Sequence, residues 1–226
     1  MAKALESAVP QVSTTVFTEG RLDPDALNDA AALVVYADGG GGNPIIRYSK
    51  EIEEFVRRGG GLACLHYAVE VPKGEHGDKL RAWIGGYFEQ WWSVNPTWTA
   101  EFTEYPEHPI TRGLRPFSLQ DEWYYHMRFD ADATHLLTAV PPEETRNRPD
   151  GPHSGNEHVR ARKGMPETLA WCIERPDGGR GFGFTGGHWH KNWEHDDFRK
   201  IVLNGIRWIA GREIPSEGIE TGPIDQ

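Results

Sequence analysis

The strongest constraint on the fold is an alternation of short apolar segments with an amphipathic helical segment early in the chain. Residues 32–37 (ALVVYA) form an unbroken apolar run, which is typical of a strand buried on both faces. Residues 48–58 carry apolar side chains at helical spacing, residues 59–61 (GGG) end this helix, and residues 62–65 form a second apolar strand. The alternation predicts right-handed crossovers and a parallel sheet, which is an α/β fold.

The rest of the chain adds elements of both kinds. The pattern predicts helices over 2–9, 25–30, 79–84 and 196–210, β-prone segments over 13–17 and 121–129, strands over 97–103 and 134–139, and a hairpin of 169–173 with 180–185. Residues 140–167 are polar and are predicted to form an inserted loop that acts as a lid or is disordered. We therefore expect one domain over 1–213 and a flexible tail over 214–226.

Charge and composition exclude several classes of partner. The formal net charge of −10 is unsuited to nucleic acid, whose phosphates need a basic surface. No apolar run approaches the roughly 20 residues of a membrane helix. The first ten residues lack the features of a secretory signal, so we expect a cytoplasmic protein. Cys64 and Cys172 each lie in an apolar stretch and are expected to be core residues, neither a disulfide nor a zinc site.

Three segments together resemble the ThuA-like (trehalose utilisation) family of the class I glutamine amidotransferase-like superfamily. They are residues 55–68 (FVRRGGGLACLHYA), 108–129 (HPITRGL followed by DEWYYHMRF) and 181–208 (GFGFTGGHWH leading into a helix). With YADGGGG before the first segment, the resemblance covers roughly residues 30–212. It implies a three-layer, flavodoxin-like, mostly parallel sheet.

The start of the chain departs from the family pattern. Resembling proteins place a strand before the helix that corresponds to residues 2–9, and the sequence shows none there. The resemblance therefore predicts a sheet that lacks the usual first strand. Such a loss exposes a strand edge that a second copy of the chain could cover, so a homo-oligomer is one expected partner state.

The resemblance also argues against glutaminase activity. Glutamine amidotransferases carry a nucleophilic cysteine on a sharp turn after a buried strand. In this chain that turn carries His66, and Cys64 lies two residues earlier, inside the strand. A thiol at that position is buried and inert, so the chain is not expected to be an amidotransferase.

Candidate site residues follow the predicted strands. In open α/β sheets, ligands bind at the carboxyl ends of the strands. The polar residues at such positions are Asp38, His66, His188 and His190, and Asp121 with Glu122 stand at the start of their β-prone segment. We expect these side chains to lie near one pocket, where histidines and carboxylates can perform acid–base or metal chemistry.

Roles can be assigned to these residues as hypotheses. His66 is the candidate acid–base, and the family resemblance implies Glu122 as its partner. His188, after Gly186-Gly187, orients the substrate or binds a metal. His188 and His190 form an H-x-H motif that, with His66, could hold a divalent metal such as zinc. The expected substrate-binding residues are Asp38, Tyr67, Asp121 and Trp189. The alternative for each histidine is a structural role, and for the tryptophan it is packing.

The resemblance implies a role in carbohydrate metabolism. The leading hypothesis is acid–base or hydrolytic chemistry on a small carbohydrate, namely trehalose or a related disaccharide, including oxidised (keto) sugars. The alternatives are a non-catalytic sugar-binding or assembly module, and a metallohydrolase of another substrate. An enzyme requires His66, His188 and a carboxylate to converge in one pocket, whereas a module would leave them apart.

Overall fold

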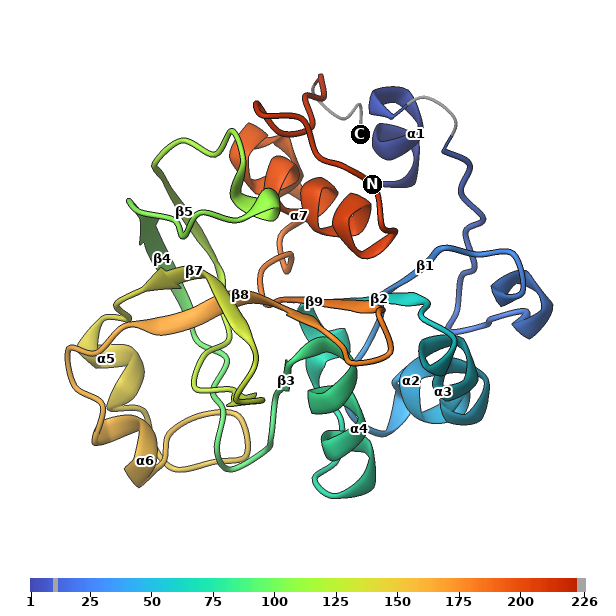
Figure 1. The fold of residues 1–226 in the computed structure, drawn as a ribbon. Helices are drawn as coiled ribbons and strands as arrows, with labels where there is room; N and C mark the ends of the chain where they lie inside the picture. Colours follow the sequence, from blue (N-terminus) through green and yellow to red (C-terminus); the bar gives the residue numbers. More distant parts are fainter. Residues whose placement is uncertain (10–11, 223–226) are drawn as a thin grey trace.

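The centre of the protein is a five-stranded sheet, seen in a computed structural model that describes residues 1–9 and 12–222 (Figure 1). In spatial order its strands are β1 (Ala32–Tyr36), β2 (Gly61–Leu65), β9 (Arg180–Phe184), β8 (Glu167–Glu174) and β7 (Thr134–Ala139). β2 is parallel to β1 and to β9, whereas β8 is antiparallel to both β9 and β7. β8 therefore runs against the other four strands, and the prediction of a mostly parallel α/β sheet is confirmed.

Helices cover both faces of this sheet (Figure 1). One face packs against α3 (Ser49–Arg57) and α4 (Glu75–Ile84), and the other against α1 (Ala2–Ala8) and α7 (Asp196–Ile209). The buried strand β2 shows why two cores form. Leu62 and Cys64 belong to the core with α3 and α4, whereas Ala63 and Leu65 belong to the core with α7, because successive side chains of a strand point to opposite faces.

Smaller elements complete the fold. Strands β4 (Thr97–Phe102) and β5 (Phe117–Glu122) form an antiparallel pair, and β3 (Gly86–Tyr87) pairs with β6 (Arg128–Phe129). The short helices are α2 (Pro44–Arg47), α5 (Glu143–Arg146) and α6 (Glu157–Arg160), with 3-10 turns at Pro24–Leu27, Gly40–Gly42, His66–Val69, Pro109–Thr111 and His190–Glu194. The side chains of β4 alternate between exposed and buried, as its sequence predicted.

Two β-prone segments differ from their prediction. Residues 13–17 form no strand and are mostly exposed, and Thr14 is instead bonded to Glu6 of α1. Residues 121–129 are not one element: β5 ends at Glu122, the aromatic residues turn into the core, and His126 has φ of 60° before β6 begins. Asp121 and Glu122 therefore stand at the end of a strand, not at its start.

The predicted inserted loop over 140–167 is ordered. It contains α5 and α6, and the buried guanidinium of Arg146 is paired with Glu167 at 3.0 Å. A lid motion of this segment stays a prediction. The sequence also predicted a flexible tail over 214–226. Residues 214–222 instead contact the domain, with Ile214 and Ile219 buried in the core, and residues 223–226 lie outside the described residues.

Both cysteines are free and buried, as expected. Burial raises the pKa of the Cys64 thiol far above its usual range, so this thiol stays protonated at neutral pH. In the described part of the chain, no helix combines the length and apolarity required to span a bilayer.

Phe184 is the core residue whose removal we expect to be most costly near the site. It lies at the end of β9, is fully buried and packs against Trp123 and Phe198. We expect Phe184→Ala to lower the free energy of unfolding by about 3–5 kcal/mol, because it leaves a cavity. Urea titration measures this. Val140→Ala, at a side chain that is 54% exposed, is the control and should change stability by less than about 0.5 kcal/mol. Equal effects of the two changes would contradict the described core.

Candidate functional site

His66 stands on a sharp turn at the carboxyl end of β2. Its φ of 53° lies in the left-handed region, which non-glycine residues rarely adopt, and a 3-10 turn begins at the same residue. The strand–turn–helix arrangement is the one that presents a reactive side chain at the top of a sheet in other α/β proteins. Strained backbone of this kind concentrates at functional sites.

A neighbouring strand fixes the orientation of the His66 imidazole. Nδ1 lies 2.8 Å from the carbonyl oxygen of Thr185, the residue that follows β9. A carbonyl can only accept a hydrogen bond, so Nδ1 carries the proton and Nε2 presents a lone pair to the site. This is the arrangement found in histidines that bind metals or accept protons.

His188 is presented by a glycine turn that follows β9. A Cβ on Gly186 would lie 2.5 Å from the Trp123 ring, so a side chain does not fit there. Gly187 has φ of 114°, which only glycine adopts without strain, and its carbonyl accepts a hydrogen bond from the Tyr36 hydroxyl. The turn directs the half-exposed His188 imidazole toward His66.

Asp121 holds this turn in place through hydrogen bonds to its backbone. Its fully buried carboxylate accepts hydrogen bonds from the backbone N–H groups of Gly187 (2.9 Å) and His188 (3.0 Å) and from the Asn192 amide (2.9 Å). It also accepts the N–H of Glu122 at 2.7 Å. The carboxylate is therefore occupied by hydrogen bonds within the protein and holds the turn to Glu122, whereas the sequence analysis expected it to bind a substrate.

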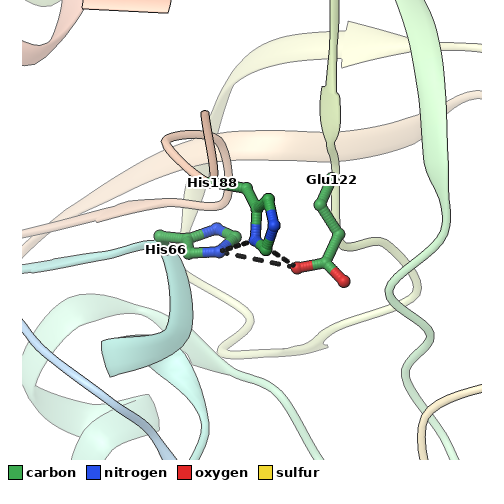
Figure 2. A group of neighbouring side chains, drawn as sticks. All are labelled: His66, Glu122 and His188. Carbon is green, nitrogen blue, oxygen red and sulfur yellow. Dashed lines mark hydrogen bonds and ion pairs between the residues drawn. The ribbon is translucent and has the colours of Figure 1, made fainter. Parts of the chain in front are cut away.

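Glu122 completes a compact group of three side chains (Figure 2). Its Oε2 lies 3.2 Å from His188 Nδ1 and 3.5 Å from His66 Nε2. The two imidazole nitrogens are 3.3 Å apart. In the part of the chain that the structure describes, this is the one group of histidine, cysteine and carboxylate side chains arranged to hold a metal ion.

Tyr124 also contacts this group, and the sequence analysis did not single it out. Its hydroxyl donates to Glu122 Oε2 at 3.2 Å and lies 3.1 Å from His66 Nε2. Burial and then Glu122 raise the pKa of this phenol, so it remains a donor at neutral pH. The available signal was its spacing of two residues from Glu122, which places both side chains on one side of an extended segment. Asn95 was also missed, and its amide donates to Glu122 Oε1 at 3.2 Å.

Burial sets the charge of the central groups. It lowers the pKa of His66, and the hydrogen bond to the Thr185 carbonyl only partly opposes this effect. His66 is therefore neutral at pH 7, with its Nε2 lone pair free to bind a metal or a proton. Burial also raises the pKa of the Glu122 carboxyl, against the effect of His188.

The remaining predicted residues surround the group at greater distance. Tyr67 is partly buried, with its ring centroid 6.3 Å from that of Tyr124, and Asp38 is exposed near it. Trp189 is partly buried beside His188. His190 is exposed and lies outside the group of three, because the chain enters a 3-10 turn there and does not stay extended. Glu122 takes the place that the H-x-H hypothesis gave to His190.

These features define an α/β protein with a histidine on a sharp turn at the carboxyl end of a parallel strand. A family model described as trehalose utilisation, ThuA, matches residues 1–209. The chain therefore belongs to the ThuA family.

Solved structures show the same fold at low sequence identity. A protein described as thua-like from Parabacteroides merdae is 16% identical, with a TM-score of 0.58 and coverage of 97% of this chain and 90% of that one. Another described as thua-like, from Bacteroides uniformis, is 17% identical, with a TM-score of 0.56 and coverage of 84% and 73%. Among curated proteins no match is found.

The lowered pKa of His66 predicts how stability depends on pH. The pKa of a histidine in the unfolded chain is about 6.5, and burial lowers the pKa of His66 in the folded protein. The stability that comes from keeping His66 neutral is therefore fully present above about pH 6.5. It is lost as the pH falls through the lower pKa of the folded state. We expect the free energy of unfolding of chelator-treated protein to fall more steeply between about pH 7 and about pH 5 than that of His66→Asn. Asparagine tolerates the left-handed backbone.

Urea titrations at each pH measure these slopes. His190→Asn, at an exposed position, serves as the control and should keep the wild-type slope. Identical slopes for the wild type and His66→Asn would show that His66 is not held neutral by burial.

Proposed function

We propose that this ThuA-family protein is a carbohydrate-processing enzyme in which a divalent metal, most simply zinc, assists acid–base or hydrolytic chemistry on a small sugar. The substrate class we propose is trehalose or a related disaccharide, including keto sugars. The family description, trehalose utilisation, supports a carbohydrate substrate. The group of His66, Glu122 and His188 supports metal-assisted chemistry.

One observation carries this proposal: three protein ligand atoms converge. The distances between His66 Nε2, His188 Nδ1 and Glu122 Oε2 are 3.2, 3.3 and 3.5 Å (Figure 2). Two ligands of one tetrahedral zinc, each about 2.0–2.1 Å from the ion, lie about 3.3–3.4 Å apart. The spacing therefore fits a shared ion. Two histidines with one glutamate are also the ligand set of several catalytic zinc sites, which keep their fourth position open for water or substrate.

The residues around such an ion have distinct tasks. The metal would polarise a substrate carbonyl or lower the pKa of a bound water. The Thr185 carbonyl holds His66 in the tautomer that offers Nε2, and Asp121 fixes the turn that carries His188. Tyr124, protonated and within hydrogen-bond distance of Glu122, is placed to donate a hydrogen bond to an oxygen bound there.

A metal-free acid–base pair is the second candidate, because the hydrogen-bond network is also complete without an ion. The Tyr124 hydroxyl and His188 Nδ1 can donate, and His66 Nε2 and Glu122 Oε2 can accept, over 3.1–3.5 Å. His66 would then act as the acid–base, and Glu122 would be its partner. In both versions the convergence favours an enzyme over a sugar-binding or assembly module.

We also propose that the sheet is a flavodoxin-like sheet without the strand that resembling proteins place first. The position of β1 at the edge of the sheet supports this. A free strand edge can pair with a second copy of the chain, which supports the expectation of a homo-oligomer.

Metal content distinguishes the two chemical versions. We expect about one equivalent of zinc per chain in protein purified without chelator, measured by elemental mass spectrometry, because three protein ligands bind the ion. His188→Ala should lose the ion, since it removes one of the ligands. His190→Ala is the matched control and should keep it, since His190 lies two residues away and outside the group.

Activity completes this test. Turnover of keto-disaccharides should fall together with zinc in His188→Ala and return when zinc is restored to chelator-treated wild-type protein. Metal-free wild-type protein that turns over the substrate at full rate would contradict the metal-assisted version and leave the acid–base pair. Retention of zinc in His188→Ala would contradict the assigned ligand set.

A further inference from the structure

A cavity of about 430 Å³ adjoins the group of three on the side of Glu122. Asn95, Thr97, Glu144, Thr145 and Arg148 line it together with Glu122. Its size lies within the range of small-molecule sites, about 300–1,000 Å³. Glu144, Thr145 and Arg148 all come from the 140–167 segment, so this segment forms one wall of the cavity.

Arg148 differs from the other arginines of the same segment. Arg146 is paired with Glu167, Arg160 with Asp150 and Arg162 with Glu167. The Arg148 guanidinium, in contrast, has no hydrogen bond or ion pair among the described residues.

One nitrogen of the Arg148 guanidinium is shielded from water, although the residue as a whole is only partly buried. Its Nη1 is buried without a hydrogen-bond partner. A shielded nitrogen with unmet donors is costly, and such atoms in native structures usually donate to a bound water, ion or ligand. The missing acceptor is therefore best supplied from the cavity that Arg148 lines.

The other cavity residues restrict the kind of ligand. Arg148 only donates hydrogen bonds, ionised Glu144 only accepts them, and Asn95 and Thr97 can do both. A carboxylate or phosphate on the ligand would suit Arg148 but would face the negative charge of Glu144. Neutral hydroxyl groups both donate and accept hydrogen bonds, so they can pair with each of these polar side chains of the cavity.

Glu122 connects this cavity to the reactive group. Its Oε2 faces His66 and His188, whereas its Oε1 accepts a hydrogen bond from Asn95 on the cavity side. A ring held in the cavity would therefore contact the same carboxylate that faces the two histidines.

We propose that this cavity is a subsite for a neutral, hydroxylated sugar ring, and that Arg148 determines specificity by donating hydrogen bonds to a ring oxygen, with Glu144 accepting from a hydroxyl. This inference rests on the proposed function and names where, and by which residues, the sugar is held. It excludes sugar acids and sugar phosphates as the preferred ligands.

Binding of defined probes tests the subsite. Saturation-transfer NMR and calorimetry would compare trehalose and glucose with glucuronate and glucose 6-phosphate, using zinc-loaded protein. We expect the neutral sugars to bind more tightly than the two anions. Arg148→Gln should weaken neutral-sugar binding by about tenfold or more, the usual cost of losing hydrogen bonds from a charged donor. Arg160→Gln is the matched control, since its guanidinium pairs with exposed Asp150, and it should bind as the wild type does.

Further variants separate this proposal from failures of folding or of the proposed function. Arg148→Lys should retain part of the affinity and the wild-type thermal midpoint. Arg148→Gln should keep its zinc, because Arg148 is not a ligand. Preference for the anions, unchanged neutral-sugar affinity in Arg148→Gln, or no binding of either neutral sugar would overturn the subsite. Arg148-dependent binding in a protein that has neither zinc nor turnover would instead overturn the proposed function and leave the subsite standing.

Discussion

The site depends on one hydrogen bond between the ends of two neighbouring strands. The carbonyl of Thr185, which follows β9, accepts the proton of His66 Nδ1 at the end of β2. This contact fixes both the tautomer and the direction of the imidazole, and without it the lone pair of Nε2 would not point at Glu122 and His188. The parallel pairing of β2 with β9 brings the two strand ends together, so the geometry of the site follows from the pairing of these strands.

A buried carboxylate performs the corresponding task for the other two members of the group. Asp121 holds the backbone of Gly187 and His188 on one side and the backbone of Glu122 on the other. The single side chain therefore sets the distance between an imidazole and a carboxylate that come from segments about 65 residues apart. Buried hydrogen bonds thus support the group of three, although His188 itself is half exposed.

Much of the fold could be predicted from the sequence, because its signals are local. The apolar run at 32–37, the helix over 48–58 and the hairpin near residue 176 each appear where periodicity and turn residues indicate. The site residues at strand ends could also be predicted, since the carboxyl ends of parallel strands meet at one edge of the sheet. The burial of Asp121, the roles of Tyr124 and Asn95, and the position of Arg148 depend on contacts between distant segments, which no local pattern encodes. His190 lies outside the group because a 3-10 turn begins there, which the H-x-H spacing alone does not reveal.

The central claim is that His66, Glu122 and His188 form one ion site whose shape is set before the ion binds. The most direct test is a crystal structure of the zinc-loaded protein with anomalous scattering recorded on both sides of the zinc edge. The account predicts one strong peak about 2.0–2.3 Å from His66 Nε2, His188 Nδ1 and a Glu122 oxygen, with the Thr185 contact to His66 Nδ1 unchanged. A peak at another group of side chains, or a His66 ring turned so that Nδ1 faces the ion, would contradict it.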